Sequence, residues 1–184
     1  MVGDQFAAVL AAAQGGDEAA FSVLWRGTNP ALLRYLRVIA LDVADDVAAE
    51  TWVHVVRSLV KFRGDETAWR AWLFTTARRR LLDQARQRRR HPTEPLDGLQ
   101  PMDVPRVPDA ASIALDNLGT QRALYLVAQL PRHQAEVVML RVVAGLDTEA
   151  VAGIVGSTPG AVRVATHRGL RRLAYLFEEA GVTL

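Results

Sequence analysis

The chain has 184 residues, of which half are apolar, and its 22 basic and 20 acidic residues leave a net charge of +2. This length fits one medium domain or two small ones, and the apolar content excludes a wholly disordered chain. The sequence holds no cysteine, no secretory signal and no run of about 18 apolar residues, which excludes disulfides and thiolate metal sites and predicts a cytoplasmic protein without membrane insertion.

The first 90 residues are predicted to be helical, because apolar residues recur at intervals of three and four. Asp17 is the predicted cap of one helix, and Asn29 followed by Pro30 predicts the start of a second. Asp42 opens a third helix and Thr67 a long fourth one. The positions that we expect to be buried in the last two helices are Val47, Thr51, Trp52, Val55, Val56 and Leu59, then Trp69, Trp72, Leu73, Thr76 and Leu81.

Five of the eight prolines fall between residues 91 and 110, where apolar periodicity is weak. This composition predicts a Pro-rich linker over 91–111 between a domain at 1–90 and a domain at 112–184. The fold class is therefore all-α, with two helical domains. Helices in the second domain are predicted over 112–129, 131–143 and 148–155, and from Thr158-Pro159 onward. The last two, joined by a short turn with Gly156, form a helix-turn-helix pattern.

Arginine is concentrated in two segments of the chain. Residues 78–90 hold seven arginines against the single acid Asp83, and residues 163–172 hold four arginines and no acid. Guanidinium pairs bidentately with phosphate, so both segments predict contact with nucleic acid. A solvated helix face is the alternative, although seven arginines would repel one another without a polyanion. Residues 42–50 hold four acids, which suit a helix N-terminus and also suit a protein-docking surface.

Taken in chain order, these segments resemble the extracytoplasmic-function sigma factors, the compact two-domain branch of the bacterial sigma-70 family. The resemblance covers nearly the whole chain. It depends on segments that are similar to region 2.2 (45–52), region 2.3 (62–65 and 69–74), region 2.4 (81–83 with the arginines that follow), the opening of region 4 (130–141) and its recognition helix (160–173). Ala49 and Arg79 depart from the Gln and Asn that are usual in the family.

The resemblance implies a promoter-recognition subunit and not an enzyme, with no catalytic residue, metal or cofactor. The implied partners are core RNA polymerase, through its beta-prime clamp helices and beta flap, promoter DNA, and an anti-sigma factor. Domain 1–90 would be sigma region 2, and domain 112–184 would be sigma region 4. The clamp would be bound by Asp45, Asp46 and Glu50.

The DNA contacts that the resemblance implies fall on both domains. The turn 61–66 would hold an unstacked base of the -10 element, and the last helix would lie in the major groove of the -35 element. The implied -10 residues are Lys61, Phe62, Arg63, Trp69, Arg78, Arg79 and Arg80. The implied -35 residues are Arg163, Val164, His167, Arg168, Arg171 and Arg172.

Competing interpretations exist for several of these features. A stand-alone helix-turn-helix regulator would share the second domain, and an adaptor that binds only proteins would leave both arginine segments unneutralised. The four tryptophans lie at helical spacing, where aromatic residues are more often core than base-stacking groups. Asp83 is interpreted as a helix-internal partner of a neighbouring arginine.

Overall fold

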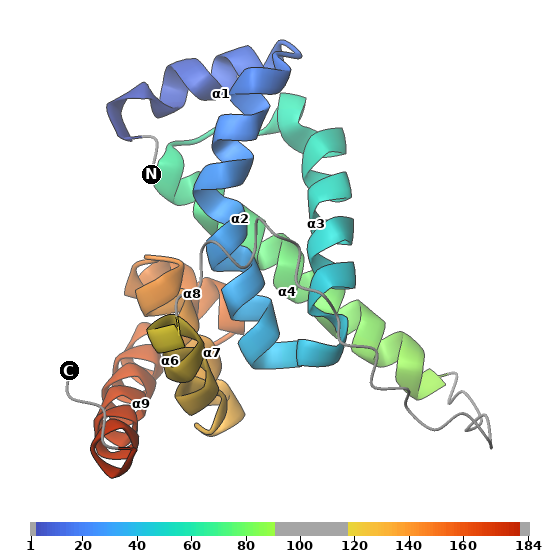
Figure 1. Ribbon diagram of the computed structural model, residues 1–184. Coiled ribbons are helices and arrows are strands. Elements are labelled where there is room, and N and C mark those ends of the chain that lie inside the picture. Colours follow the sequence, from blue (N-terminus) through green and yellow to red (C-terminus); the bar gives the residue numbers. More distant parts are fainter. Residues whose placement is uncertain (1–2, 91–117, 181–184) are drawn as a thin grey trace.

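The computed structural model describes residues 3–90 and 118–180, and all the regular structure in these two ranges is helical (Figure 1). The predicted linker at 91–111 and the predicted helix start at 112 lie outside the described residues. The α-helices are α1 (Phe6–Gln14), α2 (Glu18–Ala40), α3 (Ala44–Ser58), α4 (Glu66–Arg90), α6 (Leu118–Ala128), α7 (Arg132–Val138), α8 (Thr148–Val155) and α9 (Pro159–Glu179). Shorter helical turns are η1 (Gly3–Gln5), η2 (Leu41–Val43), η3 (Leu59–Lys61) and the π-helical η4 (Met139–Val143).

Helix α2 begins as predicted but continues through the position where a second helix was expected to start. The side chain of Asp17 accepts a hydrogen bond from the amide of Ala20 at 3.0 Å, which confirms Asp17 as the cap. The prediction of a new helix at Asn29 was wrong, because Pro30 lies inside α2. Asn29 is buried, and its Oδ1 accepts a hydrogen bond from Nε1 of Trp52 at 2.8 Å. Packing on both sides of Pro30 therefore outweighs the local cost of a proline inside a helix.

Replacing Asn29 with alanine is expected to destabilise the fold by about 1–3 kcal/mol, since Nε1 of Trp52 would stay buried and lose its acceptor. Urea unfolding of Asn29→Ala, Trp52→Phe and the double variant completes a double-mutant cycle. We expect the two substitutions to be less than additive. Strict additivity would show that this hydrogen bond contributes nothing to stability.

Helices α3 and α4 confirm most of the predicted buried positions. On α3 and at Leu59 of η3 the expected stripe is buried, except at Val56, which is 55% exposed. Asp42 lies in η2 and is not the cap of α3, which begins only at Ala44. Helix α4 begins with Glu66, one residue earlier than predicted. The reason is that the carboxylate of Asp65 accepts the amide hydrogen of Ala68 at 2.8 Å. The expected α4 positions are buried, with Trp72 half-buried.

The predicted helix-turn-helix is confirmed in α8 and α9. Asp147 caps α8 by accepting from the amide of Ala150 at 2.7 Å. Gly156 ends α8 with φ +68°, a conformation that side-chain-bearing residues rarely adopt. Thr158 caps α9 by accepting from the amide of Ala161 at 3.2 Å. These local contacts fix the turn between the two helices.

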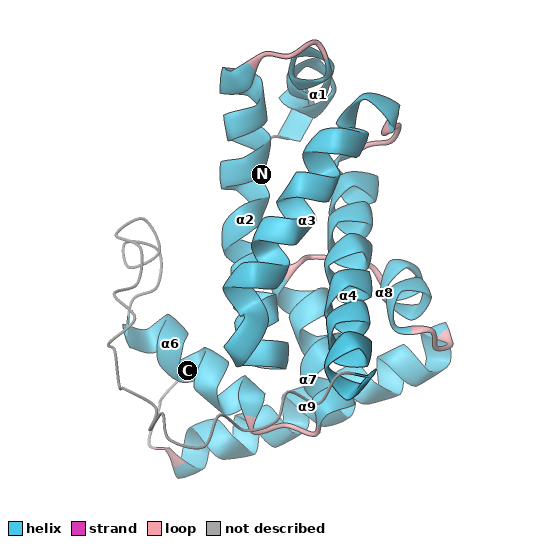
Figure 2. Cartoon of the chain, turned by 90° about the vertical axis from the view of Figure 1, so that its right-hand side faces the viewer, coloured by secondary structure: helices cyan, strands magenta, loops and turns pink. Residues whose placement is uncertain are grey.

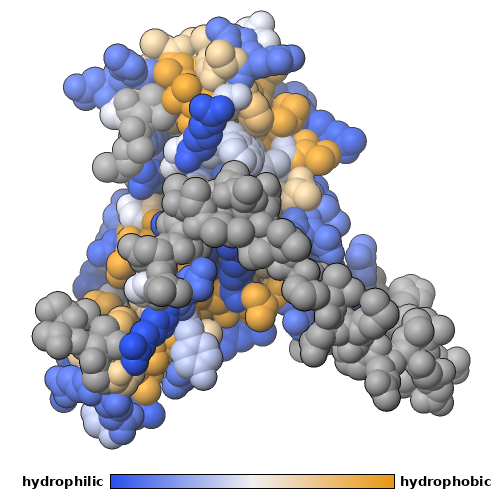
Figure 3. All heavy atoms as spheres, viewed as in Figure 1, coloured by the Kyte–Doolittle hydropathy of each residue, from blue (hydrophilic) through white to orange (hydrophobic). Residues whose placement is uncertain are grey.

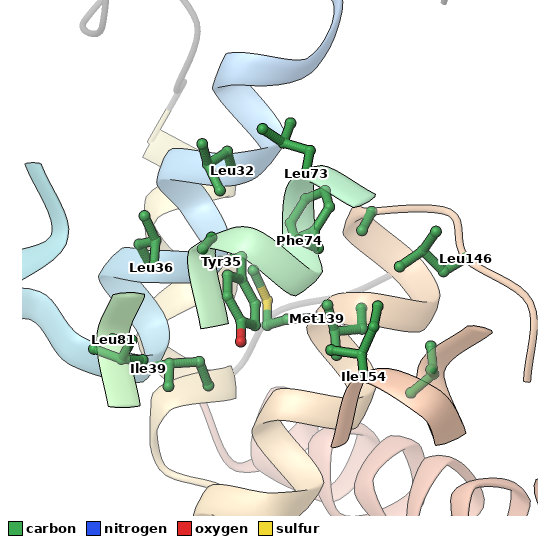
Figure 4. Packing of buried hydrophobic residues seen from close by; sticks show 14 of the residues in the cluster. Leu32, Tyr35, Leu36, Ile39, Leu73, Phe74, Leu81, Met139, Leu146 and Ile154 are labelled. Carbon is green, nitrogen blue, oxygen red and sulfur yellow. The ribbon is translucent and has the colours of Figure 1, made fainter. Parts of the chain in front are cut away.

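The N-terminal and C-terminal helices pack directly on each other. Helix α2 lies in the middle and touches α6 and α7 as well as α3 and α4, while α8 packs on α4 (Figure 2). One continuous cluster of buried apolar residues joins both halves. Figure 4 shows Tyr35 of α2 and Phe74 of α4 beside Met139 of the C-terminal half. The two halves thus share a core.

Candidate nucleic-acid interface

The three consecutive arginines of α4 point in three directions, because successive residues of an α-helix are rotated by about 100°. Arg79 is exposed. Arg80 places an Nη atom 3.3 Å from Nδ1 of His54 on α3. The Nε–H of Arg78 donates to Oε1 of Glu136 on α7 at 2.8 Å. Of these three predicted -10 residues, Arg79 is therefore the one with an exposed side chain in this conformation.

The exposed turn before α4 packs on aromatic side chains. Lys61 and Arg63 are exposed, whereas Phe62 is half-buried and stacks on Trp72 with ring centroids 5.0 Å apart. Arg63 donates to the carbonyl oxygens of Val60 and Phe62 at 2.7 and 2.6 Å, so its side chain folds back on its own turn. The side chain amide of Gln14 donates to the Phe62 carbonyl at 2.8 Å. Helix α1 thereby holds the turn in place.

Trp69 lies beneath this turn and has no exposed surface. Its ring packs against Phe62 with centroids 5.5 Å apart and against Trp52 with centroids 6.5 Å apart. Its Nε1–H is buried and finds no acceptor among the residues that the structure describes. In this conformation Trp69 supports the turn from below and offers no face to a base.

Gly64 fixes the shape of the turn, with φ +150°. A Cβ at this position would lie 2.6 Å from the Cβ of Ala68. Gly64→Ala is expected to lower the free energy of unfolding by about 1–3 kcal/mol, through backbone strain and this overlap. Thermal unfolding measures the change. Gly153→Ala is the matched control, because Gly153 lies in α8 with open space around its would-be Cβ and the change should stabilise by about 0.5–1 kcal/mol. Equal stability of the two variants would contradict the role of Gly64.

Helix α9 presents one face to solvent and buries the other. Its buried residues Val162, Ala165, Gly169 and Leu176 face the other C-terminal helices. The predicted -35 residues are all exposed and form two adjacent rows at intervals of four along the helix. These rows are Arg163, His167 and Arg171, then Val164, Arg168 and Arg172. Together the two rows hold four arginines, one histidine and one exposed valine, a set that is suited to the phosphates and base edges of a major groove.

Helix α3 presents the predicted docking residues on its exposed face. Asp45, Asp46 and Glu50 are all exposed, and Asp45 lies 3.8 Å from an Nη atom of Arg37 on α2. Both acids at 45 and 46 lie in the first turn of α3, where the helix dipole favours negative charge. A cationic protein surface would complement this face.

An apolar hollow continues from the acidic face, and sequence reasoning missed it. Its volume is about 330 Å³, and it is lined by Phe21, Trp25, Trp52, Val53, Val56 and Arg57. Figure 3 shows hydrophobic residues among hydrophilic ones in the part of the surface over α3. The available signal was Val53, an apolar residue that lies outside the predicted buried stripe and three residues after Glu50, whereas Val56 was expected to be buried. Exposed apolar surface beside charge is typical of protein-binding sites.

Within 3–90 and 118–180, no three His, Asp or Glu side chains gather as a metal site requires. In the same ranges, no helix combines the length and the hydropathy needed to cross a bilayer. The surfaces described above are the basic face of α9, the exposed turn before α4 together with Arg79, and the acidic face of α3 with its apolar hollow. They are suited to binding nucleic acid and protein.

Two family models match the chain. The model for Sigma-70 region 2 matches residues 24–91, which include α3 and α4, and the model for Sigma-70 region 4 matches residues 120–173, which include the helix-turn-helix. The sequence is 35% identical to the ECF RNA polymerase sigma factor SigD of Mycobacterium tuberculosis, over 94% of this chain and 84% of the relative. The chain belongs to the extracytoplasmic-function sigma factors of the sigma-70 family.

Other relatives of this sigma factor agree with that assignment. ShbA of Streptomyces griseus, also an ECF RNA polymerase sigma factor, is 33% identical over 89% of this chain and 91% of its own. Among solved structures, the sigma factor RpoE of Bartonella quintana, in complex with the anti-sigma factor NepR, is similar to this chain with a TM-score of 0.63. It is 25% identical and covers 86% of this chain and 96% of its own. The resemblance predicted from the sequence is confirmed.

Proposed function

We propose that this sigma factor binds core RNA polymerase through the exposed face of α3 and directs it to promoters that α4 and α9 read. The separation of its surfaces carries the proposal: an acidic face with an apolar hollow on α3, and a basic face of six exposed residues on α9. Both family models match, which favours a sigma factor over a stand-alone helix-turn-helix regulator that would lack region 2.

The polymerase-binding residues in this proposal are Asp45, Asp46 and Glu50, which would meet the beta-prime clamp helices. The adjacent hollow would take apolar side chains of the same partner. Region 4 would contact the beta flap. Charge would orient the encounter, and burial of the hollow would supply most of the affinity.

For the -10 element we propose phosphate contacts from Arg79 and Arg80, with a base held at the turn of Lys61, Phe62 and Arg63. Arg78 would join them once released from Glu136. Trp69 would act from beneath by supporting Phe62. For the -35 element, Arg163, Val164, His167 and Arg168 would lie nearest the bases, and Arg171 and Arg172 on phosphates.

The domain limits in this proposal are 1–90 for region 2, 91–111 for the linker and 112–184 for region 4. The chain would act in the cytoplasm, with its polymerase and DNA, and would have no enzymatic activity of its own. The RpoE relative binds the anti-sigma factor NepR. We propose that an anti-sigma factor binds this chain as well.

Co-elution of the purified chain with core RNA polymerase tests the proposal. We expect a stoichiometric complex on size exclusion that survives moderate salt. Chemical crosslinks from α3 should reach the beta-prime subunit. A chain that elutes alone at micromolar concentrations would overturn the proposed function.

A further inference from the structure

A buried polar cluster joins the two halves of the molecule. The hydroxyl of Tyr35 on α2 donates to Oε1 of Glu136 at 3.0 Å, and Nε–H of Arg78 on α4 donates to the same oxygen at 2.8 Å. The Glu136 side chain is 11% exposed and that of Arg78 is 23% exposed. One carboxylate of region 4 is thus held by two donors of region 2.

The chemistry of the cluster requires this pairing. A carboxylate taken out of water needs a cation or hydrogen-bond donors, and losing one of them leaves the charge uncompensated. Burial raises the pKa of Tyr35 well above its usual value, and the charge of Glu136 and the hydrogen bond to it raise it further. Tyr35 therefore keeps its proton and remains a donor. Its ring also packs on Phe74, with centroids 5.4 Å apart and nearly perpendicular.

The same face of α4 makes a second contact with region 4. The Nη1 of Arg70 donates to the carbonyl oxygen of Ala144 at 3.3 Å, while its Nη2 pairs with Glu66 at 3.1 Å. Arg70, Phe74 and Arg78 follow one another at intervals of four, so they form a single row along α4. This whole row faces the C-terminal helices or the core between the halves.

The packed arrangement is too compact to read a promoter. The -10 and -35 promoter elements are, by their positions, about 25 base pairs apart, which is about 85 Å of duplex. Here α7 and α8 alone separate α4 from α9, since α8 packs on α4 and both α7 and α8 pack on α9. That separation is roughly two helix diameters, about 20 Å. Regions 2 and 4 must come apart before both elements can be bound.

We propose that Glu136, held by Arg78 and Tyr35, is an autoinhibitory latch that keeps region 4 on region 2 in the free protein and occupies Arg78 in place of a DNA phosphate. The latch opens when the two regions separate on polymerase and promoter. This inference rests on the proposed function, because it takes Arg78 as a -10 contact. While region 4 is packed on region 2, Arg78 is paired with Glu136 and is not available to bind a DNA phosphate.

A distance measurement on the free, full-length chain tests the latch. The sequence has no cysteine, so Ala12→Cys on α1 and Ala174→Cys on α9, both exposed, place a donor and an acceptor fluorophore without interference. We expect a single high-transfer population for the otherwise unchanged chain. Glu136→Gln should raise the low-transfer, open population by about tenfold or more. Unchanged transfer in Glu136→Gln would overturn the latch.

Two further variants serve as controls for misfolding and for a general effect of charge. Tyr35→Phe keeps the buried ring and removes one donor, so it should open the chain less than Glu136→Gln does. Glu18→Gln removes an exposed carboxylate at the start of α2 and should leave the transfer unchanged. Helical circular dichroism should be retained in all of them. Opening by Glu18→Gln to the same extent would contradict a specific latch.

DNA binding by the free chain tests whether Arg78 is withheld. With a single-stranded oligonucleotide, Glu136→Gln should bind more tightly and its salt dependence should steepen by about 0.7, the effect of one extra phosphate contact. Arg78→Ala should open the chain equally without steepening the salt dependence. Equal slopes for the two variants would refute competition between Glu136 and phosphate. Since no polymerase is present, failure of the co-elution test would overturn the proposed function without changing these distances.

Discussion

Asp46→Arg combined with Glu50→Arg weakens association of the chain with core RNA polymerase by more than about 100-fold: this is the result we expect from charge reversal on the exposed face of α3. Like charges brought together at an interface cost several kcal/mol, and 2.8 kcal/mol corresponds to about 100-fold. Both side chains are exposed, so the fold should be unaffected. Fluorescence titration of labelled chain with core polymerase gives the affinity.

The matched control reverses two exposed acids elsewhere on the same half of the chain. Asp4→Arg with Glu18→Arg changes the net charge by the same amount, away from α3. This control should bind polymerase within about threefold of the unchanged chain, the small remainder being a long-range charge effect. If both double variants lose the same affinity, net charge and not the α3 face governs binding.

Substitutions on α9 should separate base reading from phosphate binding. Arg163→Ala is expected to cost about 1–3 kcal/mol on the preferred -35 sequence and little on other sequences, because a guanidinium that pairs with a base edge is specific. Arg171→Ala should weaken binding to all sequences alike and lower the salt slope by about 1. Holoenzyme affinities for a set of -35 variants at two salt concentrations measure both effects.

Arg26→Ala provides the control for these two substitutions, because Arg26 is exposed on α2. It removes the same charge and should change neither sequence preference nor salt slope. A uniform loss with Arg163→Ala, equal on every -35 sequence, would contradict its placement beside the bases. A sequence-dependent loss with Arg171→Ala would contradict its placement on phosphate.

Local signals were enough to predict most helices. Asp17 and Thr158 each accept the amide hydrogen three residues later, as a cap should, and both helix starts follow directly from sequence. The prediction failed at Asn29 and Pro30, where the pattern of a helix start is present. There the asparagine bonds to Trp52, a residue 23 positions later, and no local pattern encodes that contact.

The candidate site was predictable where charge alone defines it and not where packing does. The basic residues of α9 are exposed because the apolar positions between them bury the opposite face. By contrast, Arg78 and Arg79 look alike in the sequence, yet Arg78 faces Glu136, 58 residues later, and Arg79 faces solvent. Which face of α4 meets region 4 depends on the packing of both halves. The contact between Tyr35 and Glu136, 101 residues apart, has the same origin.

Transcription reconstituted from purified core polymerase, this chain and a library of promoter fragments tests the central claim most directly. We expect transcripts that start at a defined set of promoters only when the chain is present, and that are lost with Asp46→Arg and Glu50→Arg. Core polymerase alone should give none of them. Transcripts that are identical with and without the chain would contradict its assignment as a promoter-directing sigma factor.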